Sequence, residues 1–330
     1  MLAGGFFFSS LHRLFHLPQI VNREPGTETP KPLFLVGPTG SGKSALALAL
    51  AERIGGEIVN ADAFQIYRGL DLCTAKPGIA DRARVPHHLY DLLAPTELCD
   101  AQFYSELAAP IISDVCSRSR TPIIVGGSGL YVKALTHGLA PVPPGDEGLR
   151  EQLAALTPHE RIEWLLVRDP QAADTVNLKN DRYVTRALEI CVLSGKAQST
   201  LRKEWRQNEP VFQGICLVWD RATLYERINQ RVLTMIESGL VEEINNACAL
   251  SGTAAKAIGV REMRAHLNGE CTLEEAIAAM QQSSRHYAKR QMTWFKRETG
   301  FKTMEMNADM KMHNAVDTVL AIFPSLSRNA

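Results

Sequence analysis

Residues 37–44 have the types and spacing of a phosphate-binding loop. They match the pattern G-x-x-x-x-G-K-[ST] at every position and read Gly37-Pro38-Thr39-Gly40-Ser41-Gly42-Lys43-Ser44. Glycines allow backbone N–H groups to curl around an anion, and a helix that starts near Lys43 points its positive end at the same place. The Lys43 ammonium adds charge, and the Ser44 hydroxyl is a ligand for Mg²⁺. The pattern predicts a bound di- or triphosphate and does not specify which one.

Asp62 is a second candidate, at the end of the short apolar segment Glu57–Asp62. Ligands bind at the carboxyl ends of the strands in a parallel sheet, so a carboxylate here could act beside the phosphate. The alternative is that Asp62 caps a helix in the segment that follows. Residues 63–77 combine Gln, Tyr, Arg, Asp, Thr and Lys with little periodicity, which is typical of a functional loop.

The elements that must position these residues have the pattern of an α/β protein. Short apolar runs predict buried strands, and stretches with helical spacing such as 103–117 separate them; the runs are 33–36, 57–62, 121–127 and 213–219. We predict a P-loop NTPase-like parallel sheet flanked by helices. The strand at 121–127 ends in Gly126-Gly127, where a typical ATPase has an Asp, so generic ATP hydrolysis is disfavoured.

Changes in composition divide the chain. Pro141, Pro143, Pro144 and Gly145 mark a boundary, and helical spacing follows it. We expect a P-loop core at 32–140, a smaller and mostly helical insertion domain that binds RNA at 141–207, the second part of the core at 208–310 and a C-terminal tail or helix at 311–330. Residues 1–31 are expected to be a poorly ordered tail or an over-long translation start; a targeting segment is the alternative.

Local clusters of basic residues suggest nucleic acid, although the formal net charge is zero. Arg182, Arg186 and Glu189 share a helix face, which could contact RNA or simply face solvent. Residues 282–302 interleave basic side chains with aromatic ones, as an RNA-binding helix would, or as an amphipathic helix with an aromatic core would. Arg227 and Arg231, four residues apart, could form salt bridges or clamp an anion.

Composition excludes other classes. The seven cysteines include no CxxC pair, which is typical of reduced thiols in a cytoplasmic protein. No apolar run reaches the length of a membrane span. His87 and His88 could bind zinc, but no Cys or carboxylate stands at ligand spacing, so we expect no metal there.

These motifs, in this order, resemble one family, the tRNA dimethylallyltransferases or tRNA isopentenyl transferases. The resemblance spans about Leu33 to Arg297 and includes GPTGSGKS, NADAFQIYRGLDLCTAKP, PHHLYD, VGGSGLYVKAL, RYVTRALEI, KAIGVRE and RHYAKRQMTWFKR. The chain shows no Cys/His pattern like the zinc finger that eukaryotic relatives often add, so the bacterial type is implied. The implied reaction transfers a dimethylallyl group from its diphosphate to the N6 amine of the adenosine 3′ to the anticodon.

The resemblance also implies residue roles. Asp62 would be the general base, Thr39 and Arg231 would act on the diphosphate from opposite sides, and Ser44 would hold Mg²⁺. The implied tRNA-binding set is Asp62, Ala63, Phe64, Gln65, Ser128, Arg150, Asp181, Arg182, Tyr183, Val184, Thr185, Arg186, Lys256, Arg261, Arg285, Lys289, Arg290 and Gln291. A monomer with tRNA and dimethylallyl diphosphate as partners is expected.

Two other functions are open to a P-loop chain of this kind. A P-loop kinase of a nucleotide or small metabolite would share the strand, loop and helix but would consume ATP. A non-catalytic RNA-binding protein with a relic P-loop would not need Asp62. The intact Gly42-Lys43-Ser44 sequence and Asp62 argue against the second alternative.

Overall fold

The computed structural model describes residues 30–329 except 141, 206–211 and 248. The expected tail at 1–31 therefore lies almost entirely outside the described residues. The chain divides into two compact units. The smaller one begins at Gly138 and ends within the stretch 206–211, and the larger one contains the chain on both sides of it.

The larger unit is built on a six-stranded parallel sheet with the strand order β3-β2-β4-β1-β5-β6. The strands are β1 (Leu33–Val36), β2 (Glu57–Asn60), β3 (His87–His88), β4 (Pro122–Gly126), β5 (Gln213–Trp219) and β6 (Lys302–Met306). All four predicted strands are confirmed, with ends that shift by at most two residues. The sequence did not predict β3, which is only two residues long, or β6, whose polar residues hide its alternation.

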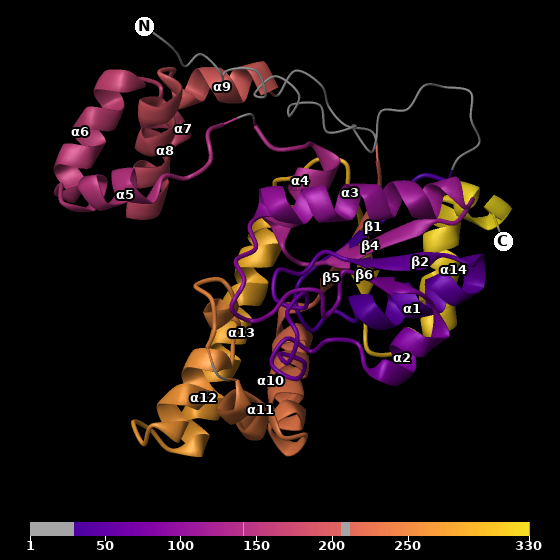
Figure 1. Cartoon of the computed structure of the whole chain (residues 1–330). Coiled ribbons are helices and arrows are strands. Elements are labelled where there is room, and N and C mark those ends of the chain that lie inside the picture. Colours follow the sequence, from indigo (N-terminus) through magenta and orange to yellow (C-terminus); the bar gives the residue numbers. More distant parts are fainter. Residues whose placement is uncertain (1–29, 141, 206–211, 248, 330) are drawn as a thin grey trace, which may run out of the picture. The chain divides into compact units, whose positions relative to one another are not determined.

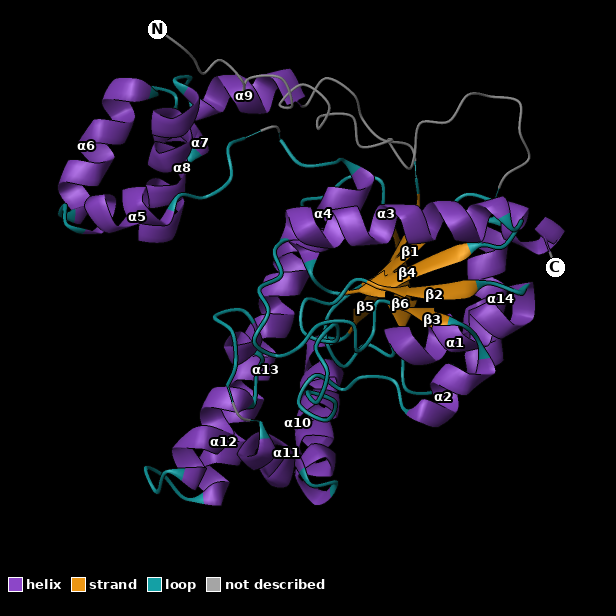
Figure 2. Ribbon diagram, viewed as in Figure 1, coloured by secondary structure: helices purple, strands orange, loops and turns teal. Residues whose placement is uncertain are grey.

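Helices cover both faces of this sheet (Figure 2). On one face, α1 (Lys43–Ile54) and α14 (Met312–Ile322) pack against Leu33 and Leu35 of β1. On the other lie α3 (Ala101–Ser117) and α4 (Gly129–Thr136). Successive side chains of a strand point to opposite faces of the sheet. Because β1 is buried along its whole length, it contributes side chains to the cores on both faces. The segment expected as a C-terminal tail or helix thus contains α14, with Val319 in the core.

Four helices of the larger unit extend beyond the sheet (Figure 1): α10 (Arg221–Glu237), α11 (Leu240–Asn246), α12 (Val260–Leu267) and α13 (Leu273–Phe295). The longest, α13, begins with a capping box between Thr272 and Glu275 and contacts α10, α12 and α4. Ala288 of α13 packs on Leu224 and Ile228 of α10. The remaining helices here are α2 (Ile79–Arg84) and the 3-10 turns η1 (Ala254–Lys256) and η2 (Pro324–Asn329).

All the regular secondary structure described in the smaller unit is helical: α5 (Glu147–Ala154), α6 (Pro158–Arg168), α7 (Ala172–Thr175), α8 (Asp181–Ser194) and α9 (Gln198–Trp205). Its core includes Leu153, Leu165, Val184 and Leu188. Val184 was expected to contact tRNA, but only 1% of it is exposed. The apolar stripe of α8 must face its neighbours, and Val184 belongs to that stripe.

Within the residues that the structure describes, no helix is both long enough and apolar enough to cross a membrane.

Candidate active site

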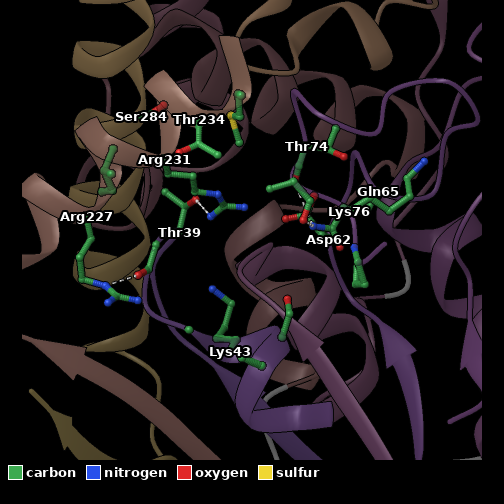
Figure 3. A pocket seen from close by; sticks show the side chains of 18 of the residues that line it. Thr39, Lys43, Asp62, Gln65, Thr74, Lys76, Arg227, Arg231, Thr234 and Ser284 are labelled. Carbon is green, nitrogen blue, oxygen red and sulfur yellow. Dashed lines mark hydrogen bonds between the residues drawn. The ribbon is translucent and has the colours of Figure 1, made fainter. Parts of the chain in front are cut away.

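The larger unit contains a cavity of about 1120 Å³ at the carboxyl ends of β1, β2 and β4 (Figure 3). The phosphate-binding loop, the 62–78 loop, α10 and α13 form its walls. Its polar lining includes Thr39, Lys43, Ser44, Asp62 and Arg231. Its apolar lining includes Ile228, Met235, Ala257, Ile258 and Met280. The cavity therefore combines an anion site with a wall suited to a hydrocarbon group.

Gly42 of the phosphate-binding loop is the N-cap residue of α1, and its φ of 87° lies in the left-handed region that favours glycine. Lys43 Nζ donates a hydrogen bond to the Pro38 carbonyl over 2.6 Å. Burial, with Arg231 nearby, lowers the pKa of Lys43 to about 8. Ser44 is exposed in the first helical turn and lines the cavity. The loop thus presents a cation and a helix N-terminus to an anion.

Two side chains hold this loop by hydrogen bonds to its backbone carbonyls. Trp219 Nε1 donates to the Ser41 carbonyl over 3.0 Å. Arg227 Nε donates to the Gly40 carbonyl over 3.0 Å, and its guanidinium lies 4.3 Å from the centre of the Trp219 ring. Arg227 was expected to form a salt bridge or to clamp an anion. Its side chain bonds a loop carbonyl, stacks on Trp219 and lines the cavity, so the anion clamp stays a prediction. No sequence pattern pointed to Trp219.

Arg231 reaches the loop from the opposite wall (Figure 3). Its Nη1 donates to Thr39 Oγ1 over 3.2 Å. Because that oxygen accepts from Arg231, the hydroxyl proton of Thr39 is left to donate to a ligand. Thr39, Lys43 and Arg231 therefore converge on one space, which the resemblance implied for the diphosphate.

Asp62 stands across the cavity from Lys43 and Arg231 (Figure 3). Asn60, fully buried at the end of β2, fixes the Asp62 backbone: Oδ1 accepts from Asp62 N over 2.9 Å, and Nδ2 donates to Asp62 O over 3.2 Å. Asp62 Oδ1 accepts from Phe64 N over 2.9 Å. The helix-cap alternative is wrong, because the carboxylate closes a turn and the next helix, α2, starts at Ile79.

The environment of Asp62 suits a proton acceptor. Burial raises the pKa of its carboxyl, and the Phe64 N–H and the charges of Lys43 and Arg231 partly offset that shift. A carboxylate with a raised pKa takes a proton more readily, as a general base must.

The 62–78 loop is held by its own contacts and by α11. Gln65 Nε2 donates to the carbonyls of Thr74 and Ala75, over 2.9 and 3.3 Å. The Glu243 carboxylate accepts from three consecutive backbone N–H groups, those of Asp71, Leu72 and Cys73, over 2.9, 2.7 and 3.0 Å. Glu243 is far from the loop in sequence, and no local pattern pointed to it.

Several residues of the implied tRNA-binding set lie at the surface of the larger unit. Lys256, Lys289 and Arg290 are exposed, and the side chain of Arg261 is 81% exposed. Others are engaged internally: Ser128 Oγ accepts from Ala63 N over 3.0 Å, and Arg285 donates to Asn229. Phe64 is half-buried and lines the cavity.

Gln291 departs from the expectation of an RNA contact, since only 5% of it is exposed. Helical spacing explains this difference, because Gln291 lies on the inward face of α13 with Ser284, Ala288 and Phe295.

In the smaller unit, Arg182, Tyr183 and Asp181 are exposed, and Thr185 is half-buried. Arg150 and Arg186 form ion pairs with Glu189, which is fully buried. Glu189 therefore belongs to the interior and not to the solvent-exposed face that its spacing indicated. Asp181 pairs with Arg161 over 2.7 Å.

The histidine pair at the edge of the sheet has local partners. His87 Nδ1 bonds the Val85 carbonyl and His88 Nε2 bonds Glu57, each over 2.8 Å. Across the described residues, no group of three or more His, Cys, Asp or Glu side chains is arranged to hold a metal ion.

A parallel sheet with a P-loop after β1 and a carboxylate with a raised pKa, Asp62, just after β2 has the arrangement of a P-loop enzyme. The family model for IPP transferase matches residues 65–298. A tRNA dimethylallyltransferase of Geobacter metallireducens is 42% identical over 87% of this chain and 96% of that protein. A tRNA dimethylallyltransferase 1 of Citrifermentans bemidjiense is 44% identical over 83% of this chain and 92% of its own length.

Solved structures agree in fold. A tRNA isopentenylpyrophosphate transferase from Bacillus halodurans has a TM-score of 0.66 and 34% identity, covering 91% of this chain and 97% of that one. A eukaryotic dimethylallyltransferase acting on tRNA has a TM-score of 0.79 and 25% identity, covering 91% of this chain and 80% of that one. The chain belongs to the IPP transferase family and has its P-loop NTPase-like fold. The kinase alternative is not favoured.

Proposed function

We propose that this protein transfers the dimethylallyl group of dimethylallyl diphosphate to the N6 amine of the adenosine 3′ to the anticodon in tRNA, releasing diphosphate. The observation that carries the proposal is that Asp62 faces Lys43 and Arg231 across one cavity (Figure 3). A leaving anion needs cations on one side of the reacting carbon, and an amine nucleophile needs a proton acceptor on the other.

The leaving group is assigned to the phosphate-binding loop. As the C–O bond breaks, negative charge grows on the diphosphate, and Lys43, Arg231 and the Thr39 hydroxyl would stabilise it. These groups are already positioned by Trp219, Arg227 and the Thr39–Arg231 bond, so little reorganisation is required. The apolar wall, including Met235, Ile258 and Met280, would receive the dimethylallyl group.

A divalent metal is typical of enzymes that act on diphosphates, and we propose Mg²⁺ for this site. Mg²⁺ commonly takes only one or two protein ligands and completes its octahedron with phosphate oxygens and water. The exposed Ser44 hydroxyl beside Lys43 fits the role of that protein ligand. When bound, the metal would neutralise charge on the diphosphate.

Asp62 is proposed as the general base. The N6 amine is a weak nucleophile because its lone pair is delocalised into the ring, and removal of its proton assists attack on the carbon. Asn60 and the Phe64 N–H hold the carboxylate in place. We propose that Gln65 helps to hold the edge of the adenine. Its amide nitrogen donates to Thr74 and Ala75, so this contact would use its amide oxygen.

The RNA is proposed to bind through exposed cations. In the larger unit these are Lys256, Arg261, Lys289 and Arg290. In the smaller unit Arg182 is exposed, and Tyr183, 57% exposed, could stack on a base. An unstacked base in a loop can be flipped into a pocket at modest cost.

We also propose that the protein works as a monomer in the cytoplasm. All the residues assigned to the diphosphate and to the base come from one chain. Every cysteine that the structure describes is a free thiol, as is common in a reducing compartment.

Product analysis tests the proposal directly. The protein is incubated with tRNA, Mg²⁺ and dimethylallyl diphosphate, and the digested RNA is examined by mass spectrometry for an adenosine carrying one added isopentenyl group. ATP in place of dimethylallyl diphosphate is the control that would reveal a kinase. No modified nucleoside from the folded protein would refute the proposed function.

A further inference from the structure

We propose that Gln291 is a positioning residue of the diphosphate site and not an RNA contact. The inference rests on the proposed function and adds a residue to it. Gln291 lies on α13, directly after the exposed residues Lys289 and Arg290, but its own side chain is buried against the phosphate-binding loop.

The Gln291 amide makes two hydrogen bonds that use both of its ends. Its Oε1 accepts from the Thr39 backbone N–H over 2.8 Å, and its Nε2 donates to the Gly127 carbonyl over 3.0 Å. A backbone N–H requires an acceptor and a carbonyl requires a donor, so only this orientation of the amide satisfies both partners. Neither a carboxylate nor an apolar side chain can replace it fully.

These bonds fix Thr39 from a second direction. The Thr39 side chain accepts from Arg231 of α10, and the Thr39 backbone donates to Gln291 of α13. The hydroxyl that is proposed to meet the diphosphate is thus held between two helices. Loss of the Gln291 bond would leave the Thr39 N–H without its partner and loosen the loop around the leaving group.

The same contacts connect the phosphate-binding loop with Asp62, the proposed general base. Gly127 follows β4, which lies between β2, the strand before Asp62, and β1, the strand before the P-loop. The next residue, Ser128, accepts from Ala63 N, directly after Asp62. Gln291 therefore helps set the spacing between the leaving-group site and Asp62.

Gly127 provides a second way to perturb the contact. A Cβ at this position would lie 2.1 Å from Gln291 Nε2. Gly127→Ala should therefore displace the Gln291 side chain while leaving Gln291 itself in the protein. Its effect should resemble that of Gln291→Ala.

The test compares Gln291→Ala, Gly127→Ala and the control Gln282→Ala, an exposed Gln on the same helix. We expect Gln291→Ala and Gly127→Ala to raise KM for dimethylallyl diphosphate about five- to tenfold, as loss of a hydrogen bond does, and to lower kcat. The Kd for tRNA should stay within twofold of the wild type. An unchanged KM with a weakened tRNA Kd would overturn the inference.

Gln291→Glu supplies a readout that a folding defect would not mimic. A protonated Glu can donate to Gly127 O and accept from Thr39 N, as Gln does, whereas the ionised form loses the donor and brings negative charge towards the diphosphate. Activity relative to wild type should fall as the pH rises, and a ratio independent of pH would contradict the assignment. Wild-type turnover is measured in parallel. A wild-type protein without turnover would refute the proposed function, whereas an active wild type with unaffected variants would refute the inference about Gln291.

Discussion

Arg231 on α10 donates a hydrogen bond from Nη1 to Thr39 Oγ1 over 3.2 Å, joining the helix to the phosphate-binding loop. Since the bond occupies the acceptor side of the hydroxyl, a ligand in the cavity meets a guanidinium and a hydroxyl donor together. This pair is the strongest structural reason to propose that the phosphate-binding loop binds a leaving anion.

Replacement of Arg231 tests that pair. We expect Arg231→Ala to lower kcat/KM for dimethylallyl diphosphate by about 10²–10³, the usual cost of removing a donor that stabilises developing charge. Steady-state kinetics with saturating tRNA measure the effect. Arg221→Ala, on the exposed start of the same helix, is the matched control and should have little effect. A loss below threefold for Arg231→Ala would exclude it from the diphosphate site.

Asp62→Asn tests the base. Asn retains an oxygen to accept from Phe64 N but cannot take a proton, so we expect kcat to fall by about 10²–10⁴. Titration of inorganic diphosphate and tRNA should show binding retained. If turnover persists, or if both ligands are lost, Asp62 is not the base.

The dependence of wild-type kcat/KM on pH should also show that Asp62 acts as a base. Burial raises the pKa of Asp62 above its ordinary 3.8, and a base acts only when ionised. We therefore expect kcat/KM to decrease as the pH falls through this raised pKa. A profile that stays flat down to pH values near 3.8 would contradict the role.

Glu243→Gln tests the anchoring of the 62–78 loop. This change replaces one carboxylate oxygen of Glu243 with an NH₂ group, which cannot accept a hydrogen bond. The three backbone N–H groups then share a single acceptor oxygen, which should lower the local stability of the loop by about 1–3 kcal/mol. We expect faster hydrogen exchange at residues 71–73 and a raised KM for dimethylallyl diphosphate. Glu242→Gln, its exposed neighbour, is the control. Unchanged exchange would show that other contacts hold the loop.

Glu57 should make stability depend on pH. Hydrogen bonds from Arg118, then from His88, lower the pKa of this buried carboxyl to about 2, from 4.5 in the unfolded chain. A lowered folded pKa gives stability that is complete above pH 4.5 and is lost as the pH falls towards 2.

We expect Glu57→Gln to lower the free energy of unfolding at neutral pH by about 1–3 kcal/mol and to weaken its dependence on acid. Urea denaturation at several pH values measures both quantities. Glu52→Gln removes an exposed partner of Arg84 and should change stability by less than about 1 kcal/mol. Equal effects of the two variants would show that burial of Glu57 adds nothing.

Local patterns determined the fold class, the P-loop and the candidate base. The P-loop is a contiguous motif that can be recognised from the sequence, and Asp62 lies at the end of a short run that predicted a strand. The strands at β1, β2, β4 and β5 were predictable for the same reason. The two-residue β3 and the polar β6 had no comparable signal, because pairing with a neighbouring strand defines them.

Only the tertiary structure decided where the intervening side chains point. Gln291 follows two exposed cations, and its bond to Thr39 spans 252 positions of sequence, so the local sequence does not indicate its partner. Glu243 and Trp219 reach the active-site loops from other elements in the same way, and Val184 and Glu189 are buried by the packing of α8. A sequence pattern states which residue types are present near a motif. The packing of α10, α11 and α13 decides which of them touch it, because side-chain direction depends on the neighbours that each helix face must bury.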